Sequence, residues 1–289
     1  MQLLVTLKAY PELFIIIVGM FAALIGSFLN VVIYRLPVMM KRDWTEQCCE
    51  LLEQENPDTE RKRFDLIMPG SRCPHCETPI KAYQNIPVIS YCLLGGKCGT
   101  CKESISIRYP IIEALTAIAA MIVAADLGIG MGSLMACLLT FALISLIMID
   151  YDHQLLPDDI TLPFLWLGII CNYWSLFTDL ESSILGAIFG YLSFWTVYIL
   201  FKLVTGKEGM GHGDFKLLAM LGAWLGWQYL PLIIVLSSLV GAAVGIFLVV
   251  TKLQERSKPI PFGPFLATAG WIALIWGDTL NRLYLNSLG

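Results

Sequence analysis

The sequence predicts an all-α polytopic membrane protein with about eight transmembrane helices and a small cytoplasmic insert that resembles a zinc ribbon. Three observations lead to this prediction. Hydrophobic residues make up 57% of the 289 residues, and the mean hydropathy is +0.70, which excludes an ordinary soluble globule. Several apolar runs have the length of about 20 residues that crosses a bilayer as a helix. Two Cys-x-x-Cys pairs lie within the large polar segment.

The apolar runs give the order of the expected helices. Seven are long enough to span a bilayer, and they cover 12–34, 110–127, 131–150, 160–178, 183–204, 230–251 and 262–281. A shorter stretch, 215–228, contains glycine and tryptophan, and we count it as the eighth span. Between the first two runs, 43–60 is expected to form either a short amphipathic helix on the membrane surface or a solvated acidic linker.

The positions of lysine and arginine predict the orientation. Eleven of them lie in 35–109, and eight spans place six more on the same side, namely Lys202, Lys207, Lys216, Lys252, Arg256 and Lys258. Only Lys8 and Arg282 would lie on the other side. Cytoplasmic loops carry such an excess of positive charge, so we expect the large loop in the cytoplasm and both termini outside. Without the eighth span, the cations of 252–258 would move outside.

Two aspartates end up at the same predicted membrane face. Asp150 ends the apolar run that starts at Met131, and Asp214 closes the tetrapeptide Gly211-His212-Gly213-Asp214 just before another apolar stretch. Ionisable groups at the edge of a membrane span are costly and usually functional. Taken alone, Asp150 could reach water from a helix end and Asp214 could be a helix N-cap. Together at one face, they favour a catalytic pair.

Such a pair provides the chemistry of an aspartyl protease. One ionised carboxylate deprotonates water and one neutral carboxylic acid polarises the carbonyl, because like charges close together cannot both ionise. The pair titrates as a unit, so the sequence leaves open which aspartate is the general base. Gly211 and Gly213 are expected to form the active-site loop, because residues without side chains let the backbone approach a substrate strand and adopt unusual turns.

Other polar residues near these positions receive more ordinary interpretations. Asp158 and Asp159 follow Pro157 and are expected to cap the next helix, while Asp152 is expected to face water. Glu113 lies just inside the second span, where an ionisable group suggests a function. Asn30 in the first span is expected to hydrogen-bond a neighbouring helix.

Four of the nine cysteines form a predicted metal site. Cys73 and Cys76 are separated by 21 residues from Cys98 and Cys101, a spacing typical of a tetrahedral zinc site with four thiolates. A closed site of this kind is structural, and zinc would supply folding energy to a loop that has little core of its own. It also favours a reducing compartment for the loop.

The ordered motifs resemble those of the bifunctional type IV prepilin peptidases, which belong to the GxGD group of intramembrane aspartyl proteases. The resemblance covers nearly the whole chain. Besides the paired cysteines, the matching segments are Gly26–Pro37, Arg108–Glu113, Ile149–Asp158, Gly209–Lys216 and Pro261–Ala267.

The resemblance implies a multi-pass enzyme of the bacterial inner membrane with both termini periplasmic. It implies cleavage of the leaders of type IV prepilins and type II secretion pseudopilins after a glycine, at the cytoplasmic face. It further implies N-methylation of the new N-terminal residue by S-adenosyl-L-methionine. The family's catalytic aspartates map onto Asp150 and Asp214, and Gly96 and Lys97 match a patch implicated in methyl transfer. We group Glu113 with them as methyltransferase-associated.

These inferences divide the chain into a first transmembrane helix at 1–34, a cytoplasmic tetracysteine loop at 35–109 and a membrane-embedded protease core at 110–289. The expected partners are pilin precursors and membrane lipid, and no nucleic acid. An alternative is a proton-coupled transporter that uses Asp150 and Asp214 as a relay. Transporters usually place such groups near the bilayer midplane between repeated halves, and no repeat is visible here. A zinc-stapled scaffold would leave the Gly211–Asp214 turn unexplained.

Overall fold

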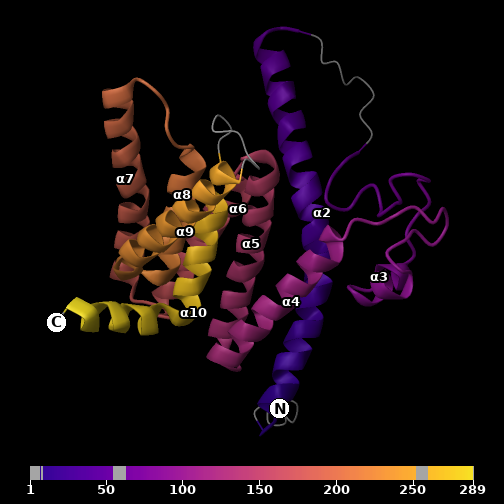
Figure 1. Cartoon of the computed structure of the whole chain (residues 1–289), viewed down its shortest axis with the longest axis horizontal. Helices are drawn as coiled ribbons and strands as arrows, with labels where there is room; N and C mark the ends of the chain where they lie inside the picture. Colours follow the sequence, from indigo (N-terminus) through magenta and orange to yellow (C-terminus); the bar gives the residue numbers. More distant parts are fainter. Residues whose placement is uncertain (1–6, 8, 55–62, 252–259, 289) are drawn as a thin grey trace. The chain divides into compact units, whose positions relative to one another are not determined.

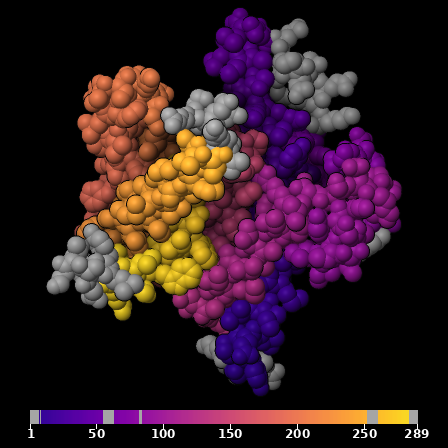
Figure 2. Space-filling model, viewed as in Figure 1, coloured from indigo at the N-terminus to yellow at the C-terminus, as the bar shows by residue number. Residues whose placement is uncertain are grey.

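The computed structural model describes residues 7, 9–54, 63–251 and 260–288, and these form two compact units, Met1–Ile129 and Gly130–Gly289 (Figures 1 and 2). The described part of the chain is helical and contains no β-strand, only two isolated β-bridges. The predicted all-α class is therefore confirmed. The orientation predicted from lysine and arginine stays a prediction, and six of these residues, Lys8, Arg61, Lys62, Lys252, Arg256 and Lys258, lie outside the described residues.

The first unit contains α2 (Pro11–Leu51), the 3₁₀ turn Ala82–Asn85, α3 (Ile89–Leu93) and α4 (Arg108–Leu127). The second unit contains α5 (Met131–His153), α6 (Asp158–Tyr173), α7 (Leu180–Thr205), α8 (His212–Leu225), the 3₁₀ turn Trp227–Tyr229, α9 (Leu230–Val250) and α10 (Gly263–Leu288). Each expected span thus corresponds to a helix.

Among the described residues, five helices are long and apolar enough to cross a membrane, and these are α2, α4, α5, α7 and α9 together with the turn before it. The predicted number of eight spans is not confirmed. Two of the other helices are short: α6 has 16 residues and α8 has 14. At 1.5 Å per residue, α8 reaches only about 21 Å, against about 30 Å for the hydrocarbon core.

In the first unit, α2 packs along α4 with very close backbone approach. A methyl group added at Gly26 would come within 2.9 Å of the Glu113 Cα atom. The Asn30 side chain donates hydrogen bonds to the backbone oxygens of Gly26 and, across the helix pair, Tyr109, which confirms the expected interhelical bond. Small residues allow this approach, and polar side chains reinforce it.

Helix α2 continues well past the predicted end of the first span at residue 34, through Pro37 to Leu51. Most of residues 38–51 favour helix and contain no glycine, so nothing after Pro37 stops the helix. Residues 43–51 are therefore the end of α2. Neither a separate amphipathic helix nor a linker begins at residue 43, and 55–60 lie outside the described residues.

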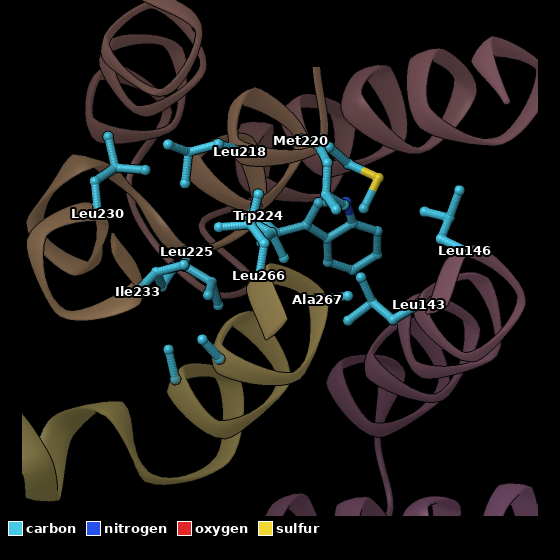
Figure 3. Close-up of a cluster of buried hydrophobic side chains, with 14 of the residues drawn as sticks. Leu143, Leu146, Leu218, Met220, Trp224, Leu225, Leu230, Ile233, Leu266 and Ala267 are labelled. Carbon is cyan, nitrogen blue, oxygen red and sulfur yellow. The ribbon is translucent and has the colours of Figure 1, made fainter. Parts of the chain in front are cut away.

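The second unit is organised around α8, which packs against α6, α7, α9 and α10. From Asp214 to Leu225, every residue of α8 except Lys216 is buried. Figure 3 shows Trp224 of α8 in the middle of an apolar cluster with Leu143 and Ala267 close by. The Trp224 indole N–H donates to the Phe164 backbone oxygen at 2.7 Å, which satisfies its one polar atom.

Glycines let α7 and α8 approach each other. The Gly186 and Gly222 backbones lie in direct contact, and a methyl group added at Gly190 would come within 2.7 Å of the Leu218 backbone oxygen. At the C-terminal end of α8, next to Gly222, Asn172 donates to the backbone oxygens of Ala223 and Trp224 at 2.8 and 3.0 Å. These bonds satisfy carbonyl groups that a helix end leaves without partners. The short stretch 215–228 is thus chiefly a buried core helix.

We expect Gly186→Ala to lower the thermal stability of the purified protein in detergent. The added methyl group would collide with the Gly222 backbone, which cannot rotate away, and overpacking of this kind costs about 1–3 kcal/mol. Gly132→Ala is the matched control, because nothing lies closer than 4.0 Å to the position of its new methyl group. Equal melting temperatures for the two variants would contradict the close packing of α7 on α8.

Candidate active site

Asp150 lies in the last turn of α5. The helix ends because Gln154 adopts the left-handed conformation with φ of 54°, while its N–H donates to the Asp150 backbone oxygen at 2.9 Å. The Asp150 side chain is only 6% exposed. A carboxyl group at this depth needs polar partners, because an isolated buried charge is very unfavourable.

Asp214 lies in the first turn of α8, three residues after the N-cap Gly211, and is 8% exposed. The first turn of a helix has unpaired N–H groups and a partial positive charge, which together favour a carboxylate. Leu156, in the turn after α5, lies against Gly213, the residue before Asp214. The structure therefore places the two predicted residues at neighbouring helix ends.

A third helix end completes the arrangement at Gly263, the first residue of α10. Its N–H donates to Asp150 Oδ2 at 3.0 Å, so the start of a helix again faces a carboxyl group. A methyl group at this position would meet Oδ2 at 2.5 Å and Leu156 at 3.2 Å. Gly263 belongs to the Pro261–Ala267 motif, but no role for it could be predicted from the sequence. Its place before a proline at the start of an apolar run is the signal that could have identified it.

The two glycines of the predicted active-site loop lie in different surroundings. Gly211 is exposed and has ordinary extended dihedrals of −75° and 143°, and Gly213 does not occupy the left-handed region either. The expectation of an unusual turn was therefore wrong for both. A methyl group on Gly213 would meet Leu156 at 2.8 Å, so this glycine permits close packing of α8 on the turn after α5. The expected approach to a substrate strand stays a prediction.

Charged residues around the pair stabilise the helix ends. Asp158 and Asp159 occupy the first turn of α6 after the N-cap Pro157, so neither is the capping residue itself. Asp158 instead forms an ion pair with Lys216 of α8, with an N–O distance of 2.7 Å. Asp152 is exposed, as expected.

A second set of interacting side chains holds the turn before α8. The Tyr198 hydroxyl donates to Glu208 Oε1 at 3.1 Å, and Lys202 Nζ donates to the same oxygen at 2.8 Å. The ion pair with Lys202, through its hydrogen bond, lowers the pKa of the Glu208 carboxyl group. The His212 ring contacts the Tyr198 ring, with 5.0 Å between centroids. These contacts fix the approach of the chain to Asp214.

The four predicted metal ligands converge in the first unit. The sulfur atoms of Cys73, Cys76, Cys98 and Cys101 all lie within 4.8 Å of one another. The sulfurs of Cys73 and Cys101 are 3.7 Å apart, close to the value of about 3.8 Å that a tetrahedral zinc site with Zn–S bonds of about 2.3 Å requires. The donor set therefore fits zinc.

The two cysteine pairs have the same backbone geometry. Glu77 and Lys102, each directly after the second cysteine of its pair, have φ of 55° and 61°. Their N–H groups donate to the backbone oxygens of Cys73 and Cys98 at 3.0 and 3.1 Å. Hydrogen bonds with Thr78 lower the pKa of the Cys76 thiol to about 6, which favours the thiolate form that binds metals.

Comparison with known proteins places these sites in a family. A model of the bacterial peptidase A24 N-terminal domain matches residues 20–127, and one of the type IV leader peptidase family matches 137–246. A prepilin leader peptidase/N-methyltransferase of Pseudomonas aeruginosa is 51% identical over 289 residues, 100% of this chain and 99% of the relative. The chain belongs to the type IV leader peptidase family.

Other relatives agree with this assignment. Proteins with the same name from Stutzerimonas stutzeri and Aeromonas hydrophila are 53% and 50% identical, and each comparison covers 96% of both chains. No solved structure matches the chain. The resemblance inferred from the motifs is confirmed, as is the assignment to a family of peptidases. The roles of individual residues stay predictions.

The residues predicted to be associated with methyl transfer, Gly96, Lys97 and Glu113, lie in the first unit. Gly95 and Gly96 end α3 with φ of 61° and 68°, and the Gly96 N–H donates to the Tyr91 backbone oxygen at 2.9 Å. This is a Schellman-type helix end, which favours glycine. A methyl group on Gly96 would also meet the Tyr91 hydroxyl at 2.9 Å. Lys97 is exposed, and its backbone pairs with that of Ser104 in an isolated antiparallel β-bridge.

Glu113 has a structural partner in the loop. Its side chain is 8% exposed, and Oε2 accepts the Val88 N–H at 2.8 Å. Val88 has φ of 60° and ψ of −50°, a conformation that is strained for a β-branched residue by about 1–3 kcal/mol. The carboxylate thus stabilises an unfavourable turn directly before α3. This bond accounts for a buried acidic residue in α4 without requiring a ligand.

We expect Gly263→Ala to reduce peptide cleavage about 10- to 100-fold, because the methyl group would displace the Asp150 carboxyl group by a fraction of an ångström or more. Gly245→Ala in α9 is the control, since its methyl group would make only an ordinary contact of 3.4 Å with Ile260. The measurement is the initial rate of leader removal by each variant. Full activity of folded Gly263→Ala would contradict a role for α10 in positioning Asp150.

Proposed function

We propose that the chain is a bifunctional enzyme of the bacterial inner membrane. It removes the leaders of type IV prepilins and type II secretion pseudopilins after a glycine at the cytoplasmic face, and it N-methylates the new N-terminal residue. The names of relatives that match the full chain support the two activities. The observation that carries the peptidase half is the pair of buried carboxyl groups, Asp150 in the last turn of α5 and Asp214 in the first turn of α8.

In the proposed reaction, the two carboxyl groups share one proton. The ionised member takes a proton from water, and the resulting hydroxide attacks the carbonyl carbon of the scissile bond. The protonated member donates a hydrogen bond to the carbonyl oxygen. The tetrahedral intermediate then collapses: the C–N bond breaks, and the leaving nitrogen receives the proton that the first carboxyl group took from water. The roles of base and acid are assigned to the pair and not to single residues, because either carboxyl group can carry the shared proton.

The surrounding helix ends support this chemistry. The Gly263 N–H donates to Oδ2 of Asp150 and so holds the carboxyl group in one orientation. The first turn of α8 orients Asp214 and places a partial positive charge beside it. Preorganised donors of this kind stabilise developing charge without rearrangement during the reaction. Both carboxyl groups lie at helix ends, consistent with a scissile bond at the boundary between lipid and water.

The residues support the two proposed cofactors to different extents. S-adenosyl-L-methionine would supply the transferred methyl group. Cys73, Cys76, Cys98 and Cys101 would hold zinc, which contributes folding energy to the loop and leaves no open position for chemistry. Gly96, Lys97 and Glu113 are proposed to support methyl transfer through the shape of the loop that contains them.

We expect Asp150→Asn and Asp214→Asn each to reduce leader cleavage of a purified type IV prepilin at least about 1,000-fold. Asparagine keeps the size of the side chain but cannot share a proton or act as a base. Asp159→Asn, an exposed carboxylate in the first turn of α6, is the matched control and should retain activity.

The same reactions with labelled S-adenosyl-L-methionine and a pre-cleaved pilin test methyl transfer separately. We expect both aspartate variants to methylate this substrate at nearly the wild-type rate. If folded Asp150→Asn and Asp214→Asn still cleave the leader, the peptidase proposal is wrong and the transporter alternative returns. Absence of methyl transfer in the wild type would overturn only the second activity.

We expect the purified protein to contain about one zinc ion per chain. Cys73→Ser or Cys98→Ser should lower the zinc content well below half of this value, and proteases should then cut 63–107 faster, because the metal stabilises the loop. Cys92→Ser is the control, since Cys92 lies outside the cluster. Zinc content that is unchanged in Cys73→Ser would contradict the assignment.

A further inference from the structure

Helix α3 turns its apolar side chains outward. Ile89, Cys92 and Leu93 follow the i, i+3, i+4 spacing that places residues on one face of a helix. All three are exposed, Ile89 by 57% and Leu93 by 82%. Ile86, just before the helix, is also exposed. A helix that faces water shows the opposite pattern, with polar residues outward.

The polar side of the same short helix faces the rest of the loop. Ser90 is buried, and its hydroxyl donates to the Gln84 backbone oxygen at 2.5 Å. The Tyr91 hydroxyl donates to the Ile105 backbone oxygen at 3.4 Å. The apolar face is exposed although the loop is folded. Its own hydrogen bonds hold the helix in this orientation.

One hydrogen bond holds α3 beside the first turns of α4. Val88, directly before α3, donates to Glu113, which is the fifth residue after the start of α4 at Arg108. At 1.5 Å per residue this lies about 7.5 Å along the helix. Helix α4 has 20 residues, so its length of about 30 Å only just matches the hydrocarbon core. Figure 1 shows α3 level with the first turns of α4 along the direction of α2.

The position of Gly26 in α2 also indicates how deep Glu113 lies in the helix pair. Gly26 packs against the Glu113 backbone and lies nine residues, or about 13 Å, before Arg35, the first charged residue after the apolar run of α2. Near this level, α4 exposes Ile111 and Leu115. In a spanning helix, exposed side chains of this kind face lipid.

We propose that α3 lies within the membrane surface and buries Ile86, Ile89 and Leu93 among the lipid chains beside α4. The loop that carries the cysteine cluster is thereby docked on the bilayer. Lipid is the occupant because the Val88–Glu113 bond holds the apolar face at the depth of the first turns of α4. Interfacial helices bury their apolar face about 5–10 Å into this boundary.

Two native cysteines provide the test. Cys92 lies on the apolar face of α3, and Cys48 lies near the C-terminal end of α2; both are exposed. The full chain with Cys49→Ser is placed in lipid nanodiscs, which leave both membrane faces open to reagents. A negatively charged maleimide and the neutral N-ethylmaleimide are then compared, and labelling at each cysteine is read by peptide mass spectrometry.

We expect the charged reagent to label Cys92 at least tenfold more slowly than Cys48, while N-ethylmaleimide labels the two within about threefold. Comparable labelling of both cysteines by the charged reagent would overturn the proposal. Protection that is found only in nanodiscs containing two chains would also overturn it, because a second copy and not lipid would then cover α3.

Two matched substitutions test lipid contact directly. Leu93→Glu places a charge on the apolar face, and Leu51→Glu alters a leucine of nearly equal exposure, 84%, at the end of α2. We expect Leu93→Glu to raise charged labelling of Cys92 at least fivefold and Leu51→Glu to leave it unchanged. Protection that persists in folded Leu93→Glu would mean that protein covers Cys92, and the proposal would fail.

Discussion

The second unit depends on the complete burial of α8. This helix is too short to span a bilayer, yet nearly every side chain after Gly213 is covered by protein. Lipid chains are as apolar as leucine, so apolar contact with other helices brings little hydrophobic gain inside a membrane. Close packing and satisfied polar groups must supply the stability instead. The Gly186–Gly222 contact provides the first, and the bonds from Asn172 to the end of α8 provide the second.

Because α8 is fixed in this way, its N-terminal turn becomes a rigid support for Asp214. The other carboxyl group comes from the opposite kind of helix end, the last turn of α5, and is held by the first N–H of α10. Leu156 lies against both Gly213 and Gly263, so one apolar side chain sets the spacing of two helix starts around the pair. Positioning by rigid helix ends suits a reaction in which small displacements are costly.

The first unit is stabilised in a different way, because residues 63–107 have little hydrophobic core of their own. The four cysteines hold one part of this segment together, and contacts with the helix pair α2–α4 hold another part in place. Buried Arg35 of α2 donates to the backbone oxygens of Asp65 and Pro69, and Glu113 of α4 accepts from Val88. A buried arginine and a buried glutamate in membrane helices thus serve as anchors for the polypeptide between them. Satisfying backbone groups in this way is what an irregular segment near lipid requires.

The all-α class, the order of the helices and the cysteine cluster could be predicted from the sequence, as could the positions of Asp150 and Asp214 at helix ends. These depend on local composition, on motif spacing and on the rule that alternate turns of a polytopic protein share a side, all of which can be read along the chain. Three features became clear only from tertiary contacts: 215–228 is chiefly a buried core helix, Gly263 holds Asp150, and Gly213 serves packing instead of an unusual turn. Each of these depends on contacts between residues distant in sequence, such as Gly186 with Gly222 and Leu156 with Gly213. Hydropathy and spacing do not encode which faces of apolar helices meet, because in a membrane every face of such a helix can be apolar.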